Sequence, residues 1–394
     1  MQTIPQLSAS ILYQAVLSWL LGLNTRRIQV HLPLVAAFIA GLLCLGNKAS
    51  CTSMAAGMTF SHDAFTRLLR GASLRALQQM VALTLVKRGG GYLVIDDIVN
   101  EKYGKVIAGI AWLFSPKLEQ KVRALNVVML GWSNGDIYVP LSFRFWKPPL
   151  SRDEKKRPSK DAFDGTPFRT KLELAVDLLK WAKHSGFVPT AVLFDAYYLA
   201  DPVMSFLKRS NWQWVSRIKS NRNVLHRGIT LKPWQWHELV DCGEMRQTKS
   251  LPVHLPSWGA IRLVKRRLKG AKEPRYLAAS NPNWGSGTIE RLYGYRWKIE
   301  TSFRDGRQWL GLGRCQSRTW QAQENHVALC LLAYCFLVQQ AAKDETLGRT
   351  ILRLKNQSIQ LKQKPAHPKV RPIKREVRRR RQKPHPVTLL CQCA

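Results

Sequence analysis

Two short apolar segments that end in carboxylates set the strongest constraint on the fold. One reads Tyr-Leu-Val-Ile-Asp-Asp from Tyr92 to Asp97 and follows three glycines. The other reads Thr-Ala-Val-Leu-Phe-Asp from Thr190 to Asp195. Runs of this length and composition are typical of buried strands. Because backbone pairing stops where a strand of an α/β sheet ends, side chains at such ends can meet a ligand.

The residues around these two runs predict a mixed sheet with helices. Asn134-Gly135 is a strong turn signal between two apolar runs, and it predicts a hairpin. Asp201-Pro202 has the residue types of a helix start, with Asp201 as the N-cap. The order of expected elements is strand, strand, hairpin, helix, strand, helix, strand, which indicates an α/β fold. The predicted strands are 92–97, 105–114, 124–132, 136–146, 190–195 and 212–218, with a loop at 147–168 and helices at 169–184 and from 201.

The composition changes along the chain and predicts several domains. A β-rich insertion is expected where Trp, Pro and Gly are frequent, with strands at 260–264 and 276–279. A helix from about Ser286 to Leu310, closed by Gly311, and a very apolar helix from about Gln321 to Ala341 follow. The predicted division is a helical DNA-binding domain (1–85), an α/β core (86–221), the insertion (222–285), the C-terminal core helices (286–345) and a basic, disordered tail (346–394).

The first 85 residues read as helical. Leu32–Leu45 is an apolar run of 14 residues that predicts a buried helix. Shorter helices are expected at 50–57 and 61–69, the second capped by Ser61 or by His62-Asp63, with Arg67 and Arg70 exposed. A helix, a short turn containing Gly and another helix resemble a helix-turn-helix arrangement. DNA contact by this region and a plain helical subdomain both remain open.

The charge of the chain indicates a polyanionic partner. Lys and Arg number 62 against 25 Asp and Glu, a formal charge of +37, and nucleic acid is the simplest partner for such an excess. Residues 353–383 hold 13 basic residues and one acid, so the rest of the chain still carries about +25. Ribosomal and packaging proteins share such charge but are usually smaller and poorer in Trp, of which this chain has 14. No amphipathic anchor or lipidation signal favours a membrane surface as the partner.

The cysteines and the N-terminus bear on the compartment. The eight cysteines show no CxxC spacing, which argues against a zinc site, and a reducing cytoplasm fits them. The 14-residue apolar run is shorter than the ~20 residues of a membrane span. We read no signal peptide at the N-terminus. His62, His226 and His326 have no ligand spacing and are interpreted as surface or core residues.

One carboxylate in the C-terminal half has an unusual setting. Tyr293, Arg296, Glu300 and Arg307 are offset by 3, 7 and 14 residues, so in a helix they fall within about 60°. An acid between two arginines on one stripe suits a metal held beside a phosphodiester. The ordinary alternative is a solvated amphipathic helix with incidental ion pairs. Together with the two strand-end acids, Glu300 would form a carboxylate cluster that favours Mg²⁺ or Mn²⁺.

These motifs resemble the DDE transposases of bacterial insertion sequences. The subgroup concerned is marked by Tyr-x2-Arg-x3-Glu-x6-Lys, which here reads Tyr293, Arg296, Glu300 and Arg307. The context Tyr-Arg-Trp-Lys-Ile-Glu-Thr-Ser-Phe-Arg-Asp, the Asp96-Asp97 pair and Phe194-Asp-Ala-Tyr-Tyr198 also resemble the family. The resemblance covers roughly residues 30–340. It departs in two places: Ile98 stands where the family has Thr or Ser, and Arg307 replaces Lys.

The resemblance implies a fold and a catalytic site. The fold would be a ribonuclease H-like mixed sheet flanked by helices, with a β-rich insertion and an N-terminal helical domain. Asp97, Asp195 and Glu300 would be the catalytic acids and would hold two Mg²⁺ ions, with Mn²⁺ as a substitute. The departure at Ile98 leaves Asp96 and Asp97 both open as the first acid, with Asp97 preferred because it is closer to the end of the motif.

The resemblance also implies a substrate. Tyr293, Arg296 and Arg307, with Trp297 and Lys298, would contact DNA. Tryptophans of the insertion are candidates to stack on an extruded base, although they are more often core residues: Trp234, Trp236, Trp258 and Trp284.

The implied activity is cut-and-paste transposition. The protein would bind inverted terminal repeats as a homodimer, cleave at the element ends, often through a hairpin, and join them to target DNA in the bacterial cytoplasm, at the nucleoid. Two alternatives remain: an inactive DNA-binding descendant, and a ribonuclease H-like nuclease without strand transfer.

Overall fold

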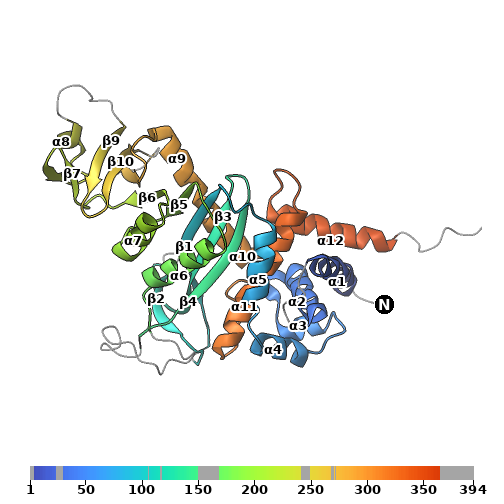
Figure 1. Ribbon diagram of the computed structural model, residues 1–394. Coiled ribbons are helices and arrows are strands. Elements are labelled where there is room, and N and C mark those ends of the chain that lie inside the picture. The colour runs from blue at the N-terminus through green and yellow to red at the C-terminus, as the bar shows by residue number, and fades with distance from the viewer. Residues whose placement is uncertain are drawn as a thin grey trace, which may run out of the picture.

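The computed structural model describes residues 4–23, 30–104, 106–115, 118–149, 168–240, 249–267, 270 and 272–363, with side chains between residues 11 and 357. A large mixed sheet forms the middle of the molecule (Figure 1). The N-terminal helices pack at one end of it, and β7 to β10 lie at the opposite end. The described helices include none that is long and apolar enough to cross a membrane.

The centre of the sheet has the strand order of a ribonuclease H-like fold. β1 (Tyr92–Glu101), β3 (Gln120–Ser133) and β4 (Tyr138–Trp146) form an antiparallel meander. β5 (Ala191–Phe194) and β6 (Trp214–Ile218) continue it in parallel on the other side of β1. The order β4-β3-β1-β5-β6 confirms the predicted fold class. The hairpin between β3 and β4 turns at Asn134-Gly135 as predicted, and Gly135 supplies a φ of 102° there.

The same sheet continues into the segment predicted as an insertion. β11 (Arg275–Ala279) pairs antiparallel with β6, so no gap separates this segment from the central strands. Beyond it lie β10 (Gly259–Arg266) and β9 (Ser250–Leu255). β7 (Val224–His226) and β8 (Ile229–Leu231) end the sheet, next to a short helix α8 (Trp236–Val240). The insertion is therefore β-rich, while its treatment as a separate domain remains a prediction.

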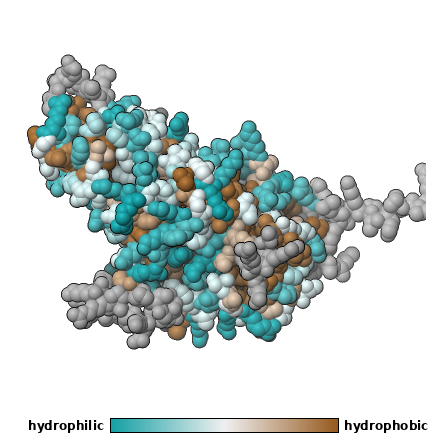
Figure 2. All heavy atoms as spheres, viewed as in Figure 1, coloured by the Kyte–Doolittle hydropathy of each residue, from teal (hydrophilic) through white to brown (hydrophobic). Residues whose placement is uncertain are grey.

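Helices cover both faces of the central strands. α6 (Lys171–His184) and α7 (Asp201–Arg209) lie on one face, where hydrophilic residues dominate the surface (Figures 1 and 2). The Thr170 and Glu173 side chains form a capping box that fixes the start of α6. α9 (Ser286–Tyr295), α10 (Trp297–Trp309) and α11 (Trp320–Gln340) pack on the other face. α11 is buried around most of its circumference, so it forms the centre of the second layer.

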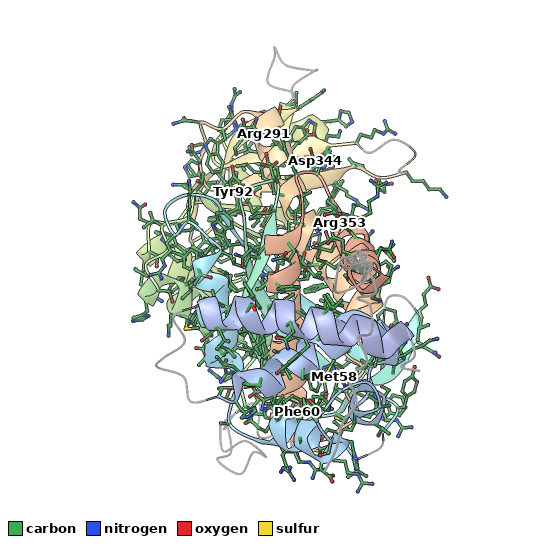
Figure 3. The ribbon with its side chains drawn as sticks, turned by 90° about the vertical axis from the view of Figure 1, so that its right-hand side faces the viewer. Met58, Phe60, Tyr92, Arg291, Asp344 and Arg353 are labelled. Carbon is green, nitrogen blue, oxygen red and sulfur yellow. The ribbon has the colours of Figure 1, made fainter. Side chains whose placement is uncertain are left out.

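The N-terminal helices form a cluster against α11. They are α1 (Ile4–Gly22), α2 (Leu32–Leu45), α3 (Cys51–Ala55), α4 (His62–Arg70) and α5 (Arg75–Thr84), with a 3-10 turn at Gly46–Lys48. α2 has the predicted bounds, and the Ser61 hydroxyl caps α4 by accepting a hydrogen bond from the Ala64 N–H at 3.2 Å. Figure 3 shows α1 crossing this cluster. Met58 and Phe60 lie at the end of the cluster that is farthest from Tyr92 and Arg291.

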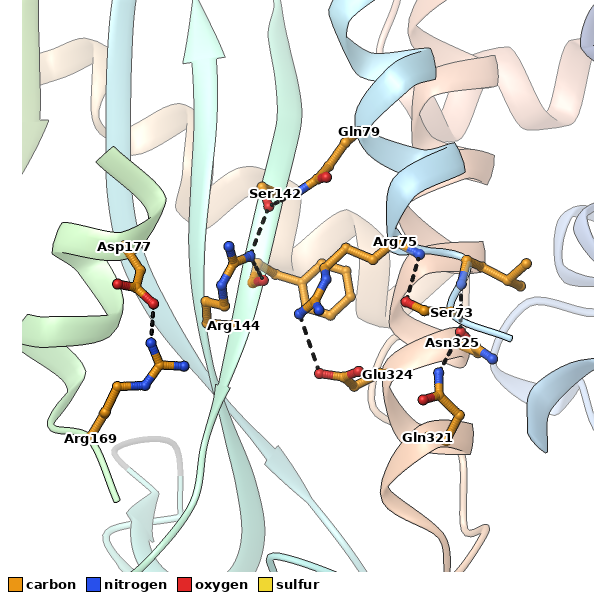
Figure 4. A network of polar contacts seen from close by, with 12 residues as sticks. Ser73, Arg75, Gln79, Ser142, Arg144, Arg169, Asp177, Gln321, Glu324 and Asn325 are labelled. Carbon is orange, nitrogen blue, oxygen red and sulfur yellow. Dashed lines mark hydrogen bonds and ion pairs between the residues drawn. The ribbon is translucent and has the colours of Figure 1, made fainter. Parts of the chain in front are cut away.

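A buried amide joins this cluster to the core. Asn325 Oδ1 of α11 accepts from the Leu74 N–H at 2.8 Å, and Nδ2 donates to the carbonyls of Leu69 and Ala72 at 3.0 and 3.1 Å. Beside it, Arg75 of α5 pairs with Glu324 at 3.5 Å (Figure 4). The α4–α5 connection is thus fixed on α11 because its free backbone groups find their partners there.

Two predicted boundaries differ from the structure. The strand expected from Lys105 begins only at Ala111, where β2 (Ala111–Ser115) pairs with the start of β3. Part of the tail predicted to be disordered forms α12 (Leu347–Gln363), which packs on α1 and buries Ile351. Residues 150–167 of the predicted loop and residues 364–394 of the tail lie outside the described part of the chain.

Candidate active site

Asp96 and Asp97 lie in the middle of β1 and point to opposite faces of the sheet. β1 continues to Glu101, so the two acids do not end the strand as predicted. Successive side chains of a strand alternate between faces, so only one of the pair can face α10. The β1–β5 register pairs Val94 with Leu193, and its continuation by two residues brings Asp96 level with Asp195 on the same face.

Asp96 and Glu300 are joined through Arg296. The Arg296 Nη1 atom donates to Asp96 Oδ2 at 2.7 Å, and its Nη2 atom forms an ion pair with Glu300 Oε1. The side chain of Arg296 is only 10% exposed, while that of Glu300 is 32% exposed. One buried guanidinium therefore binds an acid from β1 and an acid from α10.

Asp195 lies directly after β5 and is held in a turn. Its Oδ1 atom accepts from the Tyr197 N–H at 3.0 Å, and its backbone carbonyl accepts from the Ser216 hydroxyl of β6 at 3.1 Å. The bond from the Tyr197 N–H, two residues away, fixes the Asp195 carboxyl at the end of β5. The prediction that Asp195 follows an apolar strand is confirmed.

The pKa values show that these carboxyls influence one another. Burial raises the pKa of Asp96 to about 7 against the opposing effect of Arg296, and the negative charges of Asp195 and Asp97 raise it further. Burial also raises the pKa of Asp195, and the negative charge of Asp97 raises it further. Such mutual repulsion is expected of acids that share one small volume and lack enough cations to balance them.

Asp97 has different neighbours, and both oxygens of its carboxylate accept hydrogen bonds. Its Oδ2 atom accepts from Asn126 Nδ2 at 2.6 Å and from Lys171 Nζ at 2.8 Å, and its Oδ1 atom accepts from the Tyr198 hydroxyl at 3.1 Å. These partners come from β3, α6 and the turn after β5. Asp97 therefore ties α6 and that turn to the sheet.

The predicted long helix from Ser286 to Leu310 is interrupted at Arg296. α9 ends at Tyr295 and α10 begins at Trp297, and the Arg296 and Ile299 N–H groups bond to carbonyls only three residues back. The tight turn directs Arg296 toward β1. Its guanidinium carbon lies 5.3 Å from the centre of the Tyr293 ring, so three members of the predicted stripe are together: Tyr293, Arg296 and Glu300.

The other residues predicted to bind DNA have varied surroundings. Trp297 is 62% exposed, Lys298 Nζ donates to the Asp136 carbonyl at 2.9 Å, and Arg307 Nη2 donates to the Val99 carbonyl at 2.6 Å. Arg307 thus lies beside β1, two turns of α10 beyond Glu300. DNA contact by these residues remains a prediction.

The four tryptophans of the insertion also differ. Trp234 is 57% exposed and Trp236 is buried. Trp258 donates to Asp201 Oδ1 at 3.2 Å and stacks under Arg222, whereas Trp284 is partly buried. Only Trp234 presents most of its surface to solvent, so it is the strongest of these four candidates for stacking on a base.

The donor set fits a divalent metal in its chemistry. Asp96, Asp195 and Glu300 offer carboxylate oxygens, which are the ligands that Mg²⁺ and Mn²⁺ prefer. Within the ranges that the structure describes, no three acidic, His or Cys side chains are already grouped as metal ligands. Arg296 already binds one oxygen of Asp96 and one oxygen of Glu300.

Two features were not predicted from the sequence. One is Arg296 as the link between Asp96 and Glu300. The other is the set of partners of Asp97: Lys171, Asn126 and Tyr198. Strand alternation was an available signal, since it forbids Asp96 and Asp97 from facing the same helix. The partners of Asp97 gave no signal, because they come from three separate parts of the chain.

Comparison with known proteins identifies the family of the chain. The sequence model described as DDE superfamily endonuclease matches residues 22–267, a segment that includes both strand acids but not Glu300. A cryo-EM structure of the piggyBac transposase synaptic complex with hairpin DNA is similar at 12% identity and a TM-score of 0.46, over 93% of this chain and 83% of that chain. None of the curated proteins matches. Since the family model covers more than half of the sequence, the chain belongs to the DDE superfamily endonucleases.

Proposed function

We propose that this protein is a transposase of a bacterial insertion sequence. It would bind the terminal inverted repeats of its element as a homodimer, cleave the DNA at the element ends and join them to target DNA. The observation that carries the proposal is the arrangement of Asp96, Asp195 and Glu300 around Arg296. The membership in the DDE endonucleases and the charge of +37 support it.

In this proposal Asp96 is the first acid of the site, the role for which the family resemblance favoured Asp97. Asp96, Asp195 and Glu300 would hold divalent ions, since DDE endonucleases generally use them. When bound, such ions supply Lewis-acid stabilisation of the phosphodiester oxygens and activate a water or 3′-hydroxyl. Asp97, bonded to Lys171 and Tyr198, would position β1 and α6 without touching the reacting atoms.

Arg296 and its neighbours would prepare the site for DNA. The guanidinium keeps the Asp96 and Glu300 carboxylates at one place despite their repulsion. Tyr293 at the end of α9, packed on Arg296, and the exposed Trp297 at the start of α10 would meet the strand at the cleavage point. Lys298 and Arg307 would add contacts to phosphates farther along.

One observation favours an inactive DNA-binding descendant. Arg296 occupies oxygens of Asp96 and Glu300, and the described residues present no preformed group of three metal ligands. If Arg296 keeps metal ions away from these acids, the site cannot act. The same acids would also serve a nuclease without strand transfer.

A single assay separates the three functions. The protein is incubated with Mg²⁺ or Mn²⁺ and a plasmid that carries the element with its native flanks, and the products are analysed for excised ends and for joined target DNA. Excision with joining supports the transposase, and excision alone indicates the nuclease. Specific binding without any cleavage would indicate the inactive descendant and contradict the proposal.

A further inference from the structure

Three arginine side chains from different elements lie together at the edge of the sheet formed by β4. Arg75 belongs to α5, Arg144 to β4, and Arg169 lies two residues before the first residue of α6. Figure 4 shows Arg144 between Arg169, on the α6 side, and Arg75, on the α5 side. We call these three side chains the arginine cluster. It lies where the N-terminal helices, the sheet and α6 meet.

The arginine cluster is on the opposite face of the sheet from the acid site. The strand register pairs Asp97 with Val128, and Val128 with Arg144. Directly paired residues point to the same face, so Arg144 shares the face of Asp97 and not that of Asp96. At ~4.8 Å between neighbouring strands, the Cα atoms of Arg144 and Asp97 lie about 10 Å apart. The cluster is therefore separate from the acids that face α10.

The Arg144 side chain is held in place by the backbone and by a neighbouring hydroxyl. It is half-buried, and its Nη1 atom donates to the Phe143 carbonyl at 2.9 Å and to Ser142 Oγ at 3.3 Å. The same hydroxyl accepts from Gln79 Nε2 of α5 at 2.6 Å. Among the described residues, neither Nε nor Nη2 of Arg144 has a hydrogen-bond partner. Arg144 thus combines a fixed position with N–H groups that can bind a further acceptor.

Two carboxylates balance the cluster only in part. Glu324 of α11 pairs with Arg75 Nη1 at 3.5 Å, and Asp177 of α6 pairs with Arg169 Nη1. Each of these ion pairs engages one nitrogen of its arginine and leaves the others to a further acceptor. Arg144 has no acid partner within the described ranges, so three cations face two acids here.

The pKa of Arg144 shows that the three charges influence one another. Burial lowers the pKa of Arg144 to about 10, and the positive charges of Arg75 and Arg169 lower it further, against the opposing effect of Asp177 and Glu324. The three guanidinium groups are therefore near enough to repel one another in spite of the two acids. A bound anion would relieve this repulsion.

An anion with several oxygens fits this arrangement best. The side chains of Arg75 and Arg169 are 31% and 35% exposed, so a ligand can reach the cluster from solvent. Guanidinium groups bind carboxylates and phosphates through paired N–H donors. A carboxylate has two oxygens in one plane, whereas a tetrahedral phosphate has oxygens in different directions, as donors from three elements require.

We propose that the arginine cluster binds a phosphate group, carried either by DNA or by a free phosphate compound. The phosphate would accept hydrogen bonds from Arg144 Nε and Nη2 and from the guanidinium groups of Arg75 and Arg169. Because these arginines belong to α5, β4 and the segment before α6, the bound phosphate would also link the N-terminal helices to the central sheet. The inference goes beyond the proposed function, since no acid of the candidate active site takes part.

The test measures the affinity of the full chain for inorganic phosphate in EDTA. Phosphate replaces chloride at constant ionic strength, and the rise in unfolding temperature gives the dissociation constant, because a ligand of the folded state stabilises it. We expect Arg144→Gln to raise this dissociation constant about tenfold or more, as for the loss of hydrogen bonds between charged groups. Arg304→Gln is the matched control, since it removes the same charge from a side chain that is 67% exposed, and it should leave the constant unchanged.

A second variant covers the case in which Arg144→Gln lowers the stability of the fold. The unfolding temperature without phosphate reveals such a loss. Arg169→Gln removes a cation of the cluster whose side chain is 35% exposed, so it should fold normally and still weaken phosphate binding. Arg144→Lys keeps the charge without the paired N–H donors, and its affinity for phosphate should lie between those of the wild type and Arg144→Gln.

Binding of a DNA duplex of random sequence identifies the source of the phosphate. If DNA fills the cluster, Arg144→Gln should weaken duplex binding about tenfold and reduce the slope of log K against log salt by ~1. If a free phosphate compound fills it, duplex binding should stay unchanged, and only the affinity for inorganic phosphate should fall. Either result supports the cluster as a phosphate site.

The inference is wrong if Arg144→Gln and Arg169→Gln change neither affinity, or if Arg304→Gln changes the two affinities equally. The second result would show a general effect of net charge. Both measurements are made without DNA cleavage, so a failure of the transposase proposal leaves them unaffected.

Discussion

At the scale of single residues, Arg296 is the group on which the site depends. It is buried, and it binds the carboxylates of Asp96 and Glu300 at once. Removal of one partner of a buried ion pair leaves an uncompensated charge, which typically costs ~3–5 kcal/mol. Arg296 therefore acts as the internal cation of an acidic cluster, and a divalent ion would compete with it for the same oxygens.

Replacement of this cation should reveal the competition. We predict that Arg296→Ala lowers the free energy of unfolding in EDTA by about 3 kcal/mol or more. Mn²⁺ should restore part of the loss, because the metal can balance the freed carboxylates. Thermal unfolding with and without Mn²⁺ measures both effects.

The matched control is Arg304→Ala in α10, whose side chain is 67% exposed. It should change the unfolding temperature little under either condition. An equal loss of stability in Arg296→Ala with and without Mn²⁺ would show that metal and Arg296 do not share these oxygens.

His326 gives a second prediction for a single residue. Burial lowers the pKa of His326 to about 3, with a further effect of the nearby positive charge of Lys102. Between pH 3 and its ordinary pKa near 6.5, the unfolded chain binds a proton that the folded chain does not. The contribution of His326 to stability is therefore complete above about pH 6.5 and is lost as the pH falls, by at most ~1.4 kcal/mol per pH unit.

Urea unfolding from pH 7 to pH 4.5 tests this sign. His326→Gln should flatten the decline of stability toward acid relative to the wild type. His62→Gln, at a side chain that is 60% exposed, should leave the decline unchanged. A steeper decline in His326→Gln would contradict the account.

At the scale of elements, one amide pairs the buried α4–α5 turn with α11. Asn325 bonds to the backbone of Leu69, Ala72 and Leu74, which otherwise have unpaired groups in a buried turn. We predict that Asn325→Leu lowers the free energy of unfolding by about 3–4 kcal/mol, since each unpaired group costs ~1–3 kcal/mol. Chemical denaturation measures it.

Gln321→Ala is the comparison for this change. Among the described residues the Gln321 side chain has one hydrogen bond, donated to Asn325 Oδ1 at 3.2 Å, and its loss should cost less than about 1 kcal/mol. If the two variants were equally stable, the turn between α4 and α5 would have to be held by other contacts.

The sequence predicted the elements better than it predicted their ends. α2 and the start of α4 were found from an apolar run and a capping serine, which act locally. The extension of β1 past Asp97 was not found, because polar residues such as Asn100 hide the strand. The break at Arg296 was missed because Tyr293 to Arg307 satisfies a helical period, and only the bond from Arg296 to a distant strand favours the turn.

The candidate site shows the same limit. The types of residue were predictable, since carboxylates near strands and an Arg-flanked Glu indicate metal chemistry. The choice between Asp96 and Asp97 depends on which face of β1 meets α10, and tertiary packing decides that. Strand alternation alone predicts that the two acids face opposite sides of the sheet, but it does not predict which of them faces Glu300.

At the scale of the whole molecule, the C-terminal basic segment should act without sequence preference. Residues 364–394 contain ten Lys and Arg against one Glu. Cations that contact phosphates release counterions wherever they bind. We predict that truncation after Gln363 reduces the slope of log K against log salt by several units and leaves the preferred DNA sequence unchanged.

The site of truncation matters in this experiment. Truncation after Gly348 would also remove Ile351, which is buried, and Arg353, which bonds to Glu345 at 2.8 Å. This shorter protein should unfold at a lower temperature, whereas the protein ending at Gln363 should not. If the protein that ends at Gln363 lost its preference for element ends, a sequence-independent role of residues 364–394 would be contradicted.

In the proposed function, the acids on the α10 face of the sheet form the metal site. Calorimetric titration with Mn²⁺ in the presence of DNA tests it, on the wild type and on Asp96→Asn, Asp97→Asn, Asp195→Asn and Glu300→Gln. We predict that Asp96→Asn, Asp195→Asn and Glu300→Gln each weaken Mn²⁺ binding about tenfold or more, which corresponds to ~1.4 kcal/mol. Asp97→Asn should retain binding, because its carboxylate already bonds to Lys171, Asn126 and Tyr198. Loss of Mn²⁺ binding in Asp97→Asn with full binding in Asp96→Asn would contradict the central claim.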